Sequence, residues 1–169
     1  MSVVAPEWCT TATMRRYWAR PYSVPLSRLR ARRFKRRLWE HGYVTPNYTR
    51  AEAASHDGVD VPSELRSACQ RQGLHLERVR HGCGDKPLPV LSWYRSRSWN
   101  AANGGATDSQ HLYARASDIA ESIRQTLGGT HFDDVCQRVF AGGGIGTQTV
   151  YGGPVRHVDC RRGPARWVY

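Results

Sequence analysis

The sequence predicts an α+β fold with one compact domain. Short strand candidates are separated by longer helical or loop segments, and no internal repeat is visible. The chain has 169 residues, of which 40% are hydrophobic, and it includes six Trp and eight Tyr. A chain of this length and composition can bury one core and carry a short appendage.

The first element is a cationic helix predicted over residues 26–40, LSRLRARRFKRRLWE. Leu29, Phe34 and Leu38 recur near the helical period of 3.6 residues, so a narrow apolar stripe runs along an otherwise charged surface. Residues 1–27 are rich in turn formers, and residues 41–47 resemble a linker.

This pattern divides the chain in two. We expect a basic N-terminal extension over residues 1–46 and a more ordinary domain over residues 47–169. The formal net charge is +11, and residues 1–43 hold ten Arg and Lys against two Glu, which is +8 of that total. A basic extension of this kind is typical of segments that bind polyanions: nucleic acid, anionic lipid or a phosphate-bearing cell wall.

Three interpretations of the basic segment stay open. It can target the protein to an anionic wall or membrane, or it can bind nucleic acid. It can also be a solvated helix that packs its apolar stripe against the domain.

The first part of the expected domain contains sequence patterns that are typical of helices. The sequence Thr49-Arg-Ala-Glu52 is a capping-box pattern that predicts a short helix. A further helix is predicted over residues 62–73 with Gly73 as its stop, and residues 75–81 either extend it or begin a second helix.

The remaining elements alternate between short strands and short helices. In chain order we predict a strand over 87–94, a loop over 95–108, helices over 119–127 and 131–140, a glycine run over 142–146, a strand over 155–160 and a closing strand over 166–169.

The five cysteines lie far apart and form no CxxC pair, which argues against a cysteine-rich zinc site and a dense disulfide framework. Their odd number favours mainly reduced thiols, and a single bridge such as Cys69–Cys83 stays open. No apolar run is long enough to span a bilayer, and the N-terminus lacks the apolar core of a signal peptide.

The segment Ser109–Asp118, SQHLYARASD, places an imidazole and a carboxylate seven positions apart, at His111 and Asp118. His157 and Asp159 follow later in the chain. Two nitrogen donors and two carboxylates suit a catalytic zinc ion, which needs three protein ligands, an open position for water and a spare acid/base group.

Geometry limits how these groups meet. Residues seven apart on a helix are separated by about 10 Å along its axis, so His111 and Asp118 can share an ion only if the chain between them loops or extends. On a strand, His157 and Asp159 project from one face and Val158 from the other. Asp118 can instead be a helix N-cap, with Glu121 completing a capping box.

A family resemblance supports the metal interpretation. The stretch LSWYRSRSWNAANGGATDSQHLYARASDIA resembles the core motif of the zinc D-Ala-D-Ala carboxypeptidase family, in its phage and actinobacterial wall-hydrolase branch. This family shares a fold with lysostaphin-type endopeptidases and the hedgehog domain. The matching elements, in chain order, are Tyr94-Arg95-Ser96, Asn100, Gly104-Gly105-Ala106, Ser109 through Asp118, Gly143–Gly146, His157-Val-Asp159 and Arg166-Trp167.

The resemblance covers residues 47–169 and implies a small central antiparallel sheet flanked by helices. It also implies that His111, Asp118 and His157 bind Zn²⁺ and that Arg95 faces the substrate. Ser109 and Gln110 are expected to orient the site or the substrate.

The sequence departs from the family pattern at two positions. The family glycine between the first two ligands is Ala114, where a positive φ would be strained. The position three residues before the final histidine, which is acidic in several members, is Pro154. Asp159 is the carboxylate left nearby, so we assign it the acid/base role. Tyr151 is expected mainly to pack, with an extra oxyanion donor as the alternative.

The leading hypothesis is a zinc metallopeptidase that hydrolyses a D-amino-acid-containing peptide bond of bacterial peptidoglycan, as a carboxypeptidase or an endopeptidase. A phage endolysin or virion enzyme fits the absence of a signal peptide, and it would act outside the cell or in the host wall after release. We expect a monomer whose substrate is the peptidoglycan stem peptide. The alternatives are a non-catalytic zinc-containing wall-binding module of the same fold and a basic nucleic-acid-binding protein.

Overall fold

The computed structural model describes residues 28–149 and 153–169, with side chains described from residue 31. The elements follow in this order: α2 (Arg28–Glu40), β1 (Tyr43–Thr45), β2 (Tyr48–Thr49), α3 (Arg50–Ala53), η1 (Ser63–Leu65), α4 (Arg66–Gly82), α5 (Arg97–Ala102), η2 (Gln110–Tyr113), β3 (Ala116–Asp118), α6 (Glu121–Thr126), α7 (Thr130–Val139), β4 (Gly144–Thr147), β5 (Val155–Asp159) and β6 (Ala165–Val168). Cys9 and Tyr151 lie outside the described residues.

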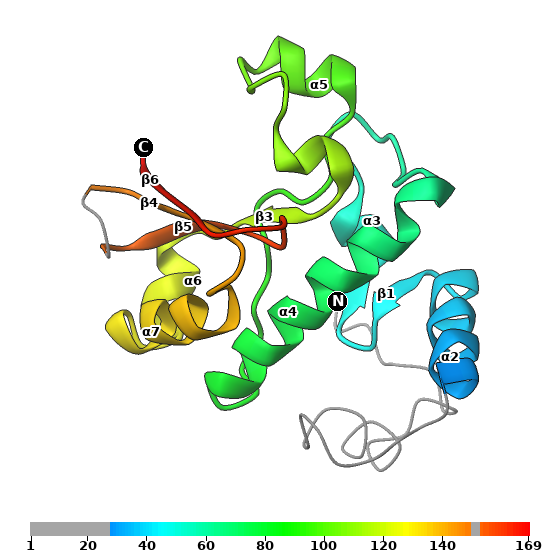
Figure 1. Ribbon diagram of the computed structural model, residues 1–169, viewed down its shortest axis with the longest axis horizontal. Coiled ribbons are helices and arrows are strands. Elements are labelled where there is room, and N and C mark those ends of the chain that lie inside the picture. The colour runs from blue at the N-terminus through cyan, green and yellow to red at the C-terminus, as the bar shows by residue number, and fades with distance from the viewer. Residues whose placement is uncertain (1–27, 150–152) are drawn as a thin grey trace.

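A four-stranded sheet organises the C-terminal half in the order β3-β5-β4-β6. The β3–β5 and β4–β5 pairs are antiparallel, and the β4–β6 pair is parallel. In the view of Figure 1, α6 and α7 lie below this sheet and α5 lies above it. The expected α+β class, with a small sheet flanked by helices, is confirmed, but the sheet is mixed and not wholly antiparallel, because the closing strand β6 runs parallel to β4.

The basic helix α2 packs on the rest of the molecule through its C-terminal end. Leu38 and Trp39 are buried, and the Gln70 side-chain amide of α4 donates to the backbone carbonyl of Lys35. The strand β1 that follows pairs with β2, so the expected boundary at residue 46 falls inside a hairpin. Leu38, the last residue of the predicted apolar stripe, therefore contributes to the core.

The helix α4 is longer than the sequence predicts, because Gly73 does not end it. Gly73 is buried inside α4, where β1 crosses it. A Cβ atom at this position would lie 2.7 Å from Thr45 Cγ2 and 3.1 Å from Val44 Cγ1. The glycine is thus required for close packing between helix and strand, and residues 75–81 extend the same helix.

Two other segments differ from the expectation. Residues 87–94 form no strand and contribute only an isolated bridge between Ser92 and Asp118. Within the expected loop 95–108, Ser96 caps the short helix α5 by accepting a hydrogen bond from the backbone N–H of Trp99. This cap satisfies a backbone N–H of the first turn and so stabilises the six-residue helix.

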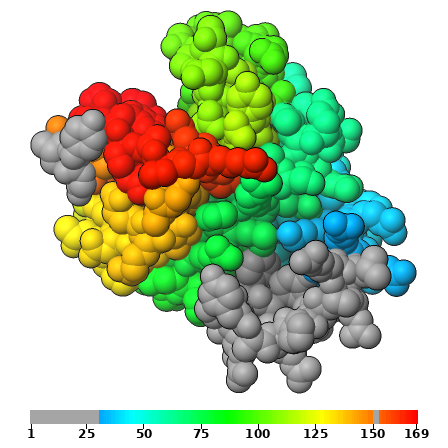
Figure 2. All heavy atoms as spheres, in the orientation of Figure 1, coloured from blue at the N-terminus to red at the C-terminus, as the bar shows by residue number. Residues whose placement is uncertain are grey.

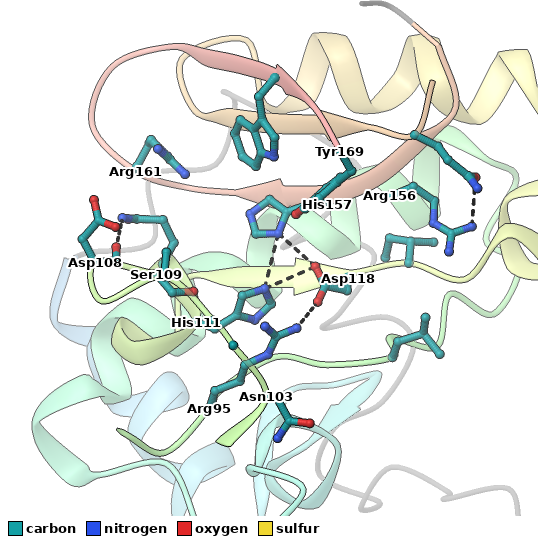
Figure 3. Close-up of a pocket in the computed structure, with 18 residues that line it drawn as sticks. Arg95, Asn103, Asp108, Ser109, His111, Asp118, Arg156, His157, Arg161 and Tyr169 are labelled. Atoms are coloured by element: carbon teal, nitrogen blue, oxygen red, sulfur yellow. Dashed lines mark hydrogen bonds and ion pairs between the residues drawn. The ribbon is translucent and has the colours of Figure 1, made fainter. Parts of the chain in front are cut away.

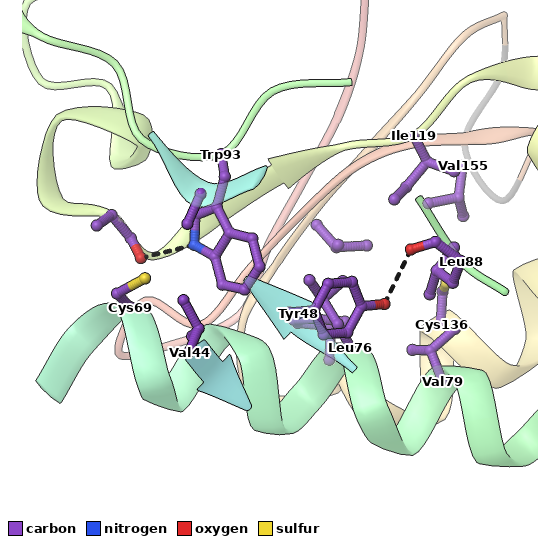
Figure 4. Packing of buried hydrophobic residues seen from close by; sticks show 14 of the residues in the cluster. Val44, Tyr48, Cys69, Leu76, Val79, Leu88, Trp93, Ile119, Cys136 and Val155 are labelled. Carbon is purple, nitrogen blue, oxygen red and sulfur yellow. Dashed lines mark hydrogen bonds between the residues drawn. The ribbon is translucent and has the colours of Figure 1, made fainter. Parts of the chain in front are cut away.

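The core joins α4 to the strands that carry the site (Figure 4). Trp93 is fully buried, donates its indole N–H to the carbonyl of Ala114 at 3.1 Å, and meets the Tyr48 ring edge-on at 5.6 Å. The buried Gln72 side chain of α4 donates to Ser117 Oγ at 3.2 Å and to the Val158 carbonyl at 3.0 Å. These bonds tie the central helix to β3 and β5, which carry the candidate site.

Cys69, Cys83, Cys136 and Cys160 are buried free thiols. Cys69 lies near the start of α4 and Cys83 at its C-cap, so the length of the helix separates them by about 21 Å and excludes the Cys69–Cys83 bridge. Within the described residues, no helix combines the length and apolarity that crossing a bilayer requires.

Candidate metal centre

A tight turn brings His111 and Asp118 together. His111 lies in the short 3₁₀ helix η2, and Asp118 is the last residue of the strand β3. Between them Ala114 adopts a left-handed conformation with φ of +51°, and the backbone reverses there. The chain between the two residues therefore loops, as the metal interpretation requires. Asp118 is not a helix cap, since the N-cap of α6 is Ala120.

The sheet register supplies the third group. Asp118 of β3 and His157 of β5 are directly opposed partners in the antiparallel pair. His157 Nδ1 lies 2.9 Å from Asp118 Oδ1 and 3.3 Å from His111 Nε2, and His111 Nε2 lies 3.2 Å from Asp118 Oδ1 (Figure 3).

These distances fit one shared metal ion. Ligand atoms that bind a tetrahedral zinc at roughly 2.0–2.1 Å lie about 3.3 Å from one another. One ligand atom from each of His111, Asp118 and His157 lies within 4.8 Å of the other two. Two imidazole nitrogens that face each other this closely, both oriented toward one carboxylate oxygen, form a donor set suited to zinc.

The second nitrogen of each imidazole is also engaged. His111 Nδ1 lies 2.6 Å from the Trp93 carbonyl, and His157 Nε2 lies 3.1 Å from Asp159 Oδ2. Because a carbonyl and a carboxylate accept hydrogen bonds, these contacts place the ring protons on those two nitrogens. The lone pairs of His111 Nε2 and His157 Nδ1 then face the shared position.

Asp159 lies behind His157 and not beside the open cavity. Its side chain is completely buried. Besides His157 it accepts hydrogen bonds from the Gly144 backbone N–H, the Arg161 backbone N–H and the Arg161 guanidinium. Its carboxylate therefore meets the nitrogen of His157 that faces away from the metal position.

Arg95 joins the site on the other side of Asp118. Its Nη2 lies 2.5 Å from Asp118 Oδ2, and its Nε donates to Ser92 Oγ at 3.0 Å. Asp118 therefore offers one oxygen to the two histidines and the other to Arg95, which holds the carboxylate plane in place.

Burial and hydrogen bonding set the charges of the cluster. Burial opposes ionisation of Asp118, but hydrogen bonds from His111 and His157 outweigh it and hold the pKa of that carboxyl well below its usual value. Burial lowers the pKa of His111, although Asp118 partly opposes this effect. Burial also lowers the pKa of His157, but hydrogen bonds to Asp118 and Asp159 outweigh it and raise that pKa. His111 and Asp118 thus have the protonation states that a metal ion requires, and His157 must release its Nδ1 proton when a metal binds.

The cluster opens into a cavity of about 780 Å³. In Figure 2 the segment with α5 and η2 stands beside the C-terminal strands, and residues of both line the cavity. Ser109 and Gln110 line it next to His111, and Trp167 of β6 and Tyr169, which follows that strand, also line it. This cavity gives an extended ligand access to the metal position.

The structure thus brings together His111, Asp118, His157 and Arg95, and it places Ser109 and Gln110 on the cavity wall. Sequence reasoning missed the Trp93 carbonyl, because a backbone acceptor leaves no mark in the sequence. It also missed Gly144, whose missing side chain leaves room for Asp159: a Cβ there would lie 2.2 Å from Asp159 Oδ2. The glycine run 142–146 was the available signal.

The fold and the site define a class: a small α+β domain with a metal-ligand cluster beneath an open cavity. A family model described as Peptidase M15 matches residues 43–149, and the chain belongs to this family. Among curated proteins, the zinc D-Ala-D-Ala carboxypeptidase of Streptomyces albus G is 43% identical over 44 residues. That match covers 26% of this chain and 17% of the relative. His157 and Asp159 lie beyond the residues that the family model matches.

Proposed function

We propose that this protein is a zinc-dependent peptidase that hydrolyses a D-amino-acid-containing peptide bond of bacterial peptidoglycan. The observation that carries the proposal is the convergence of His111, Asp118 and His157 beneath an open cavity. Membership of the peptidase M15 family and the similarity to a zinc D-Ala-D-Ala carboxypeptidase support the reaction and the substrate class.

Zinc is the cofactor that the family and the donor set support. In the proposed site His111 Nε2, His157 Nδ1 and Asp118 Oδ1 hold the ion and leave its cavity side open. Zinc, when bound, polarises the scissile carbonyl and lowers the pKa of a water molecule. The protein's part is to keep both histidines in the correct tautomer and to hold the three ligands at the spacing observed.

Arg95, Ser109 and Gln110 are the proposed substrate-binding residues. Two of the three guanidinium nitrogens of Arg95 are bound to Ser92 and Asp118, which leaves Nη1 to donate to a carbonyl or a developing oxyanion. Arg95 would therefore contact the substrate while it also holds Asp118 in place.

The proton-transfer role expected for Asp159 does not suit its position. A general base must come within hydrogen-bond reach of the water that it deprotonates. Asp159 is completely buried and binds the nitrogen of His157 that faces away from the cavity. We propose that Asp159 orients His157 and strengthens it as a ligand, as carboxylates behind metal-binding histidines do.

We propose Asp108 as the general base because it lines the cavity and is not a proposed metal ligand. Among the described residues that line the cavity, the carboxylates are Asp108 and the ligand Asp118. The pKa of Arg161 is raised by its hydrogen bonds to Asp159, and the nearby charge of Asp108 adds to that effect. In this proposal Asp108 takes the proton of the water and passes it to the leaving amine.

The experiment measures bound zinc and peptide hydrolysis on the same preparations. Wild type, His157→Ala and the matched control His81→Ala are dialysed against zinc, and each is assayed on purified peptidoglycan and a synthetic stem pentapeptide. His81 is an exposed histidine that pairs with Asp85 away from the site. We expect about one zinc and hydrolysis for wild type and His81→Ala, and neither for His157→Ala.

The alternatives give different results. A wild type without zinc contradicts the proposal. A wild type that binds zinc and peptidoglycan without releasing new amino groups is a wall-binding module. The newly formed amino and carboxyl ends of the products distinguish a carboxypeptidase from an endopeptidase.

A further inference from the structure

Three arginines line the cavity, and two of them are occupied by carboxylates of the site itself. Arg95 binds Asp118 and Arg161 binds Asp159, with nitrogen–oxygen distances of 2.5 and 2.6 Å. Arg156 is different, because within the described residues its hydrogen-bond partner is the neutral side-chain oxygen of Gln148, at 3.2 Å. Among the described residues, Arg156 therefore has no carboxylate within hydrogen-bond distance, and the neutral Gln148 side chain leaves most of its donors available.

Glu121 is the carboxylate that pairs with Arg156, and this ion pair is longer than those of Arg95 and Arg161. Glu121 Oε2 lies 3.9 Å from Arg156 Nη1, beyond hydrogen-bond distance. Glu121 is already engaged through its other oxygen, which accepts hydrogen bonds from Arg124 at 2.8 Å and from Gln125 at 2.6 Å. The Arg156 side chain is about one-third exposed, so its remaining N–H donors are open to a ligand.

An irregularity in the sheet directs Arg156 toward the cavity. In a regular strand Arg156 and its neighbour His157 would project from opposite faces. The β4–β5 register shifts here, since Gly146 pairs with His157 and the next residue, Thr147, pairs with Val155. Arg156 is the extra residue of this bulge, and both it and His157 line the cavity. Bulges next to active sites commonly redirect a side chain in this way.

Figure 3 shows where Arg156 lies relative to the metal ligands. Asp108 and Arg161 lie on one side of Asp118, and Arg156 lies on the other. The cavity thus continues past the ligand cluster toward Arg156, where Leu91, Ile119 and Gln148 also line it. A peptide bound across the cluster would bring a neighbouring residue to this guanidinium.

We propose that Arg156 is a specificity-determining residue that binds a carboxylate of the peptide substrate. The inference rests on the proposed peptidase function and specifies its substrate as an anionic peptide. A guanidinium binds a carboxylate through two parallel hydrogen bonds, which gives both affinity and orientation. In a stem peptide the carboxylate has two sources: the free C-terminus and the acidic residue within the peptide.

The experiment compares four peptides on the zinc-loaded wild type, Arg156→Gln and the control Arg138→Gln, an exposed arginine on α7. The parent peptide is L-Ala-D-isoGlu-L-Lys-D-Ala-D-Ala. The others carry a C-terminal amide, an amide at the D-isoGlu carboxylate, or both. We expect Arg156→Gln to lower kcat/KM for the parent about 10- to 100-fold, mainly through KM, because charged hydrogen bonds are worth roughly 1.5–3 kcal/mol.

The amidated peptides identify the carboxylate. For wild type, amidation of the recognised carboxylate should lower kcat/KM by the same factor as the Arg156→Gln substitution does. Arg156→Gln itself should have equal kcat/KM for that amidated peptide and for the parent. Arg138→Gln should behave as wild type. Equal kcat/KM of wild type on all four peptides overturns the inference and leaves the peptidase function intact. A zinc-loaded wild type that cleaves neither these peptides nor purified peptidoglycan overturns the proposed function, and this inference with it.

A second variant tests the same contact without removing the arginine. Gln148→Glu places a carboxylate 3.2 Å from the guanidinium, where it competes with that of the substrate. We expect KM for the parent peptide to rise and kcat to change little. An unchanged KM would contradict the inference. If wild type cleaves peptidoglycan but not the pentapeptide, the four peptides are titrated into zinc-loaded wild type and Arg156→Gln, and Kd replaces kcat/KM. The inference then requires that amidation of the recognised carboxylate weakens binding to wild type but not to Arg156→Gln.

Discussion

His157 lies between two aspartates that differ in their access to the cavity. Asp118 approaches its Nδ1 and Asp159 its Nε2, at 2.9 and 3.1 Å. Each aspartate also binds an arginine, Arg95 for Asp118 and Arg161 for Asp159. The Asp118 side chain is 21% exposed and lines the cavity, whereas the Asp159 side chain is completely buried.

The residue type alone therefore does not decide the role of a carboxylate at this site. The side facing the cavity can share an ion with two imidazoles and leave room for a substrate. The buried side can only hold the imidazole in one tautomer and orientation. The pKa of Asp159 is lowered because hydrogen bonds from His157 and Arg161 outweigh the cost of its burial. It therefore remains an anion that stabilises His157 from behind.

The largest effect on zinc binding and hydrolysis is expected from replacing Asp118, the aspartate on the cavity side of His157. Asp118→Ala removes one of three ligands and leaves Arg95 without its carboxylate partner. We expect zinc affinity to fall by more than the roughly 10- to 100-fold that changes behind a ligand cause, and hydrolysis to be lost. A competition titration with a chromogenic chelator measures the affinity. Full zinc binding by this variant would remove Asp118 from the ligand set.

Replacing Asp159, the buried aspartate behind His157, should affect zinc binding less than replacing Asp118 does. We expect Asp159→Asn to weaken zinc binding about 10- to 100-fold, with much of kcat restored at saturating zinc. If Asp159 were the general base, the variant would keep its zinc affinity and lose kcat even at saturation. In parallel, Asp108→Asn is expected to keep zinc affinity and lose kcat.

The space around Asp159 provides a third test. Gly144→Ala would place a Cβ atom 2.2 Å from Asp159 Oδ2 and 2.8 Å from Arg161 Nε, so the carboxylate must move. We expect a destabilisation of about 1–3 kcal/mol and weaker zinc binding. The matched control is Gly142→Ala, where no atom lies within 4 Å of the added carbon. Thermal unfolding with and without zinc separates the two effects, and equal behaviour of the variants would contradict this packing.

The smallest effect is expected from Asp57, an aspartate outside the metal centre that does not line the cavity. Asp57 is exposed, and hydrogen bonds from Ser55 and Ser96 are the main reason that its pKa is lowered to about 2. Because the folded value lies below the unfolded one, this contribution to stability is present above the usual pKa of 3.8 and is lost as the pH falls toward about 2.

Asp57→Asn should therefore flatten the fall in Tm over this acidic range and leave zinc binding unchanged. Asp134→Asn, on the exposed side of α7, serves as the control. A Tm profile for Asp57→Asn that follows wild type throughout would show that these hydrogen bonds do not favour the ionised form.

Local signals in the sequence were sufficient for much of the fold. The capping box at Thr49 and Glu52 is present with both reciprocal hydrogen bonds. The helix over α2, the helices α6 and α7, and the strands β5 and β6 occur where periodicity and composition predict them. Predictions failed where a tertiary contact outweighed local preference. Gly73 stays within α4 because β1 packs against it, and the apolar stretch before Trp93 has no strand partner except at Ser92.

For the site, the sequence by itself supplied the candidates, and the family resemblance selected His111, Asp118 and His157 from the seven histidines and fourteen acidic residues of the chain. Only the tertiary structure decided how they are used. The left-handed turn at Ala114 folds His111 back toward Asp118, and the strand register places His157 opposite Asp118. Burial then separates the two aspartates of His157, and one extra residue in β5 directs Arg156 into the cavity. Register and burial depend on contacts between distant segments, which local sequence patterns do not encode.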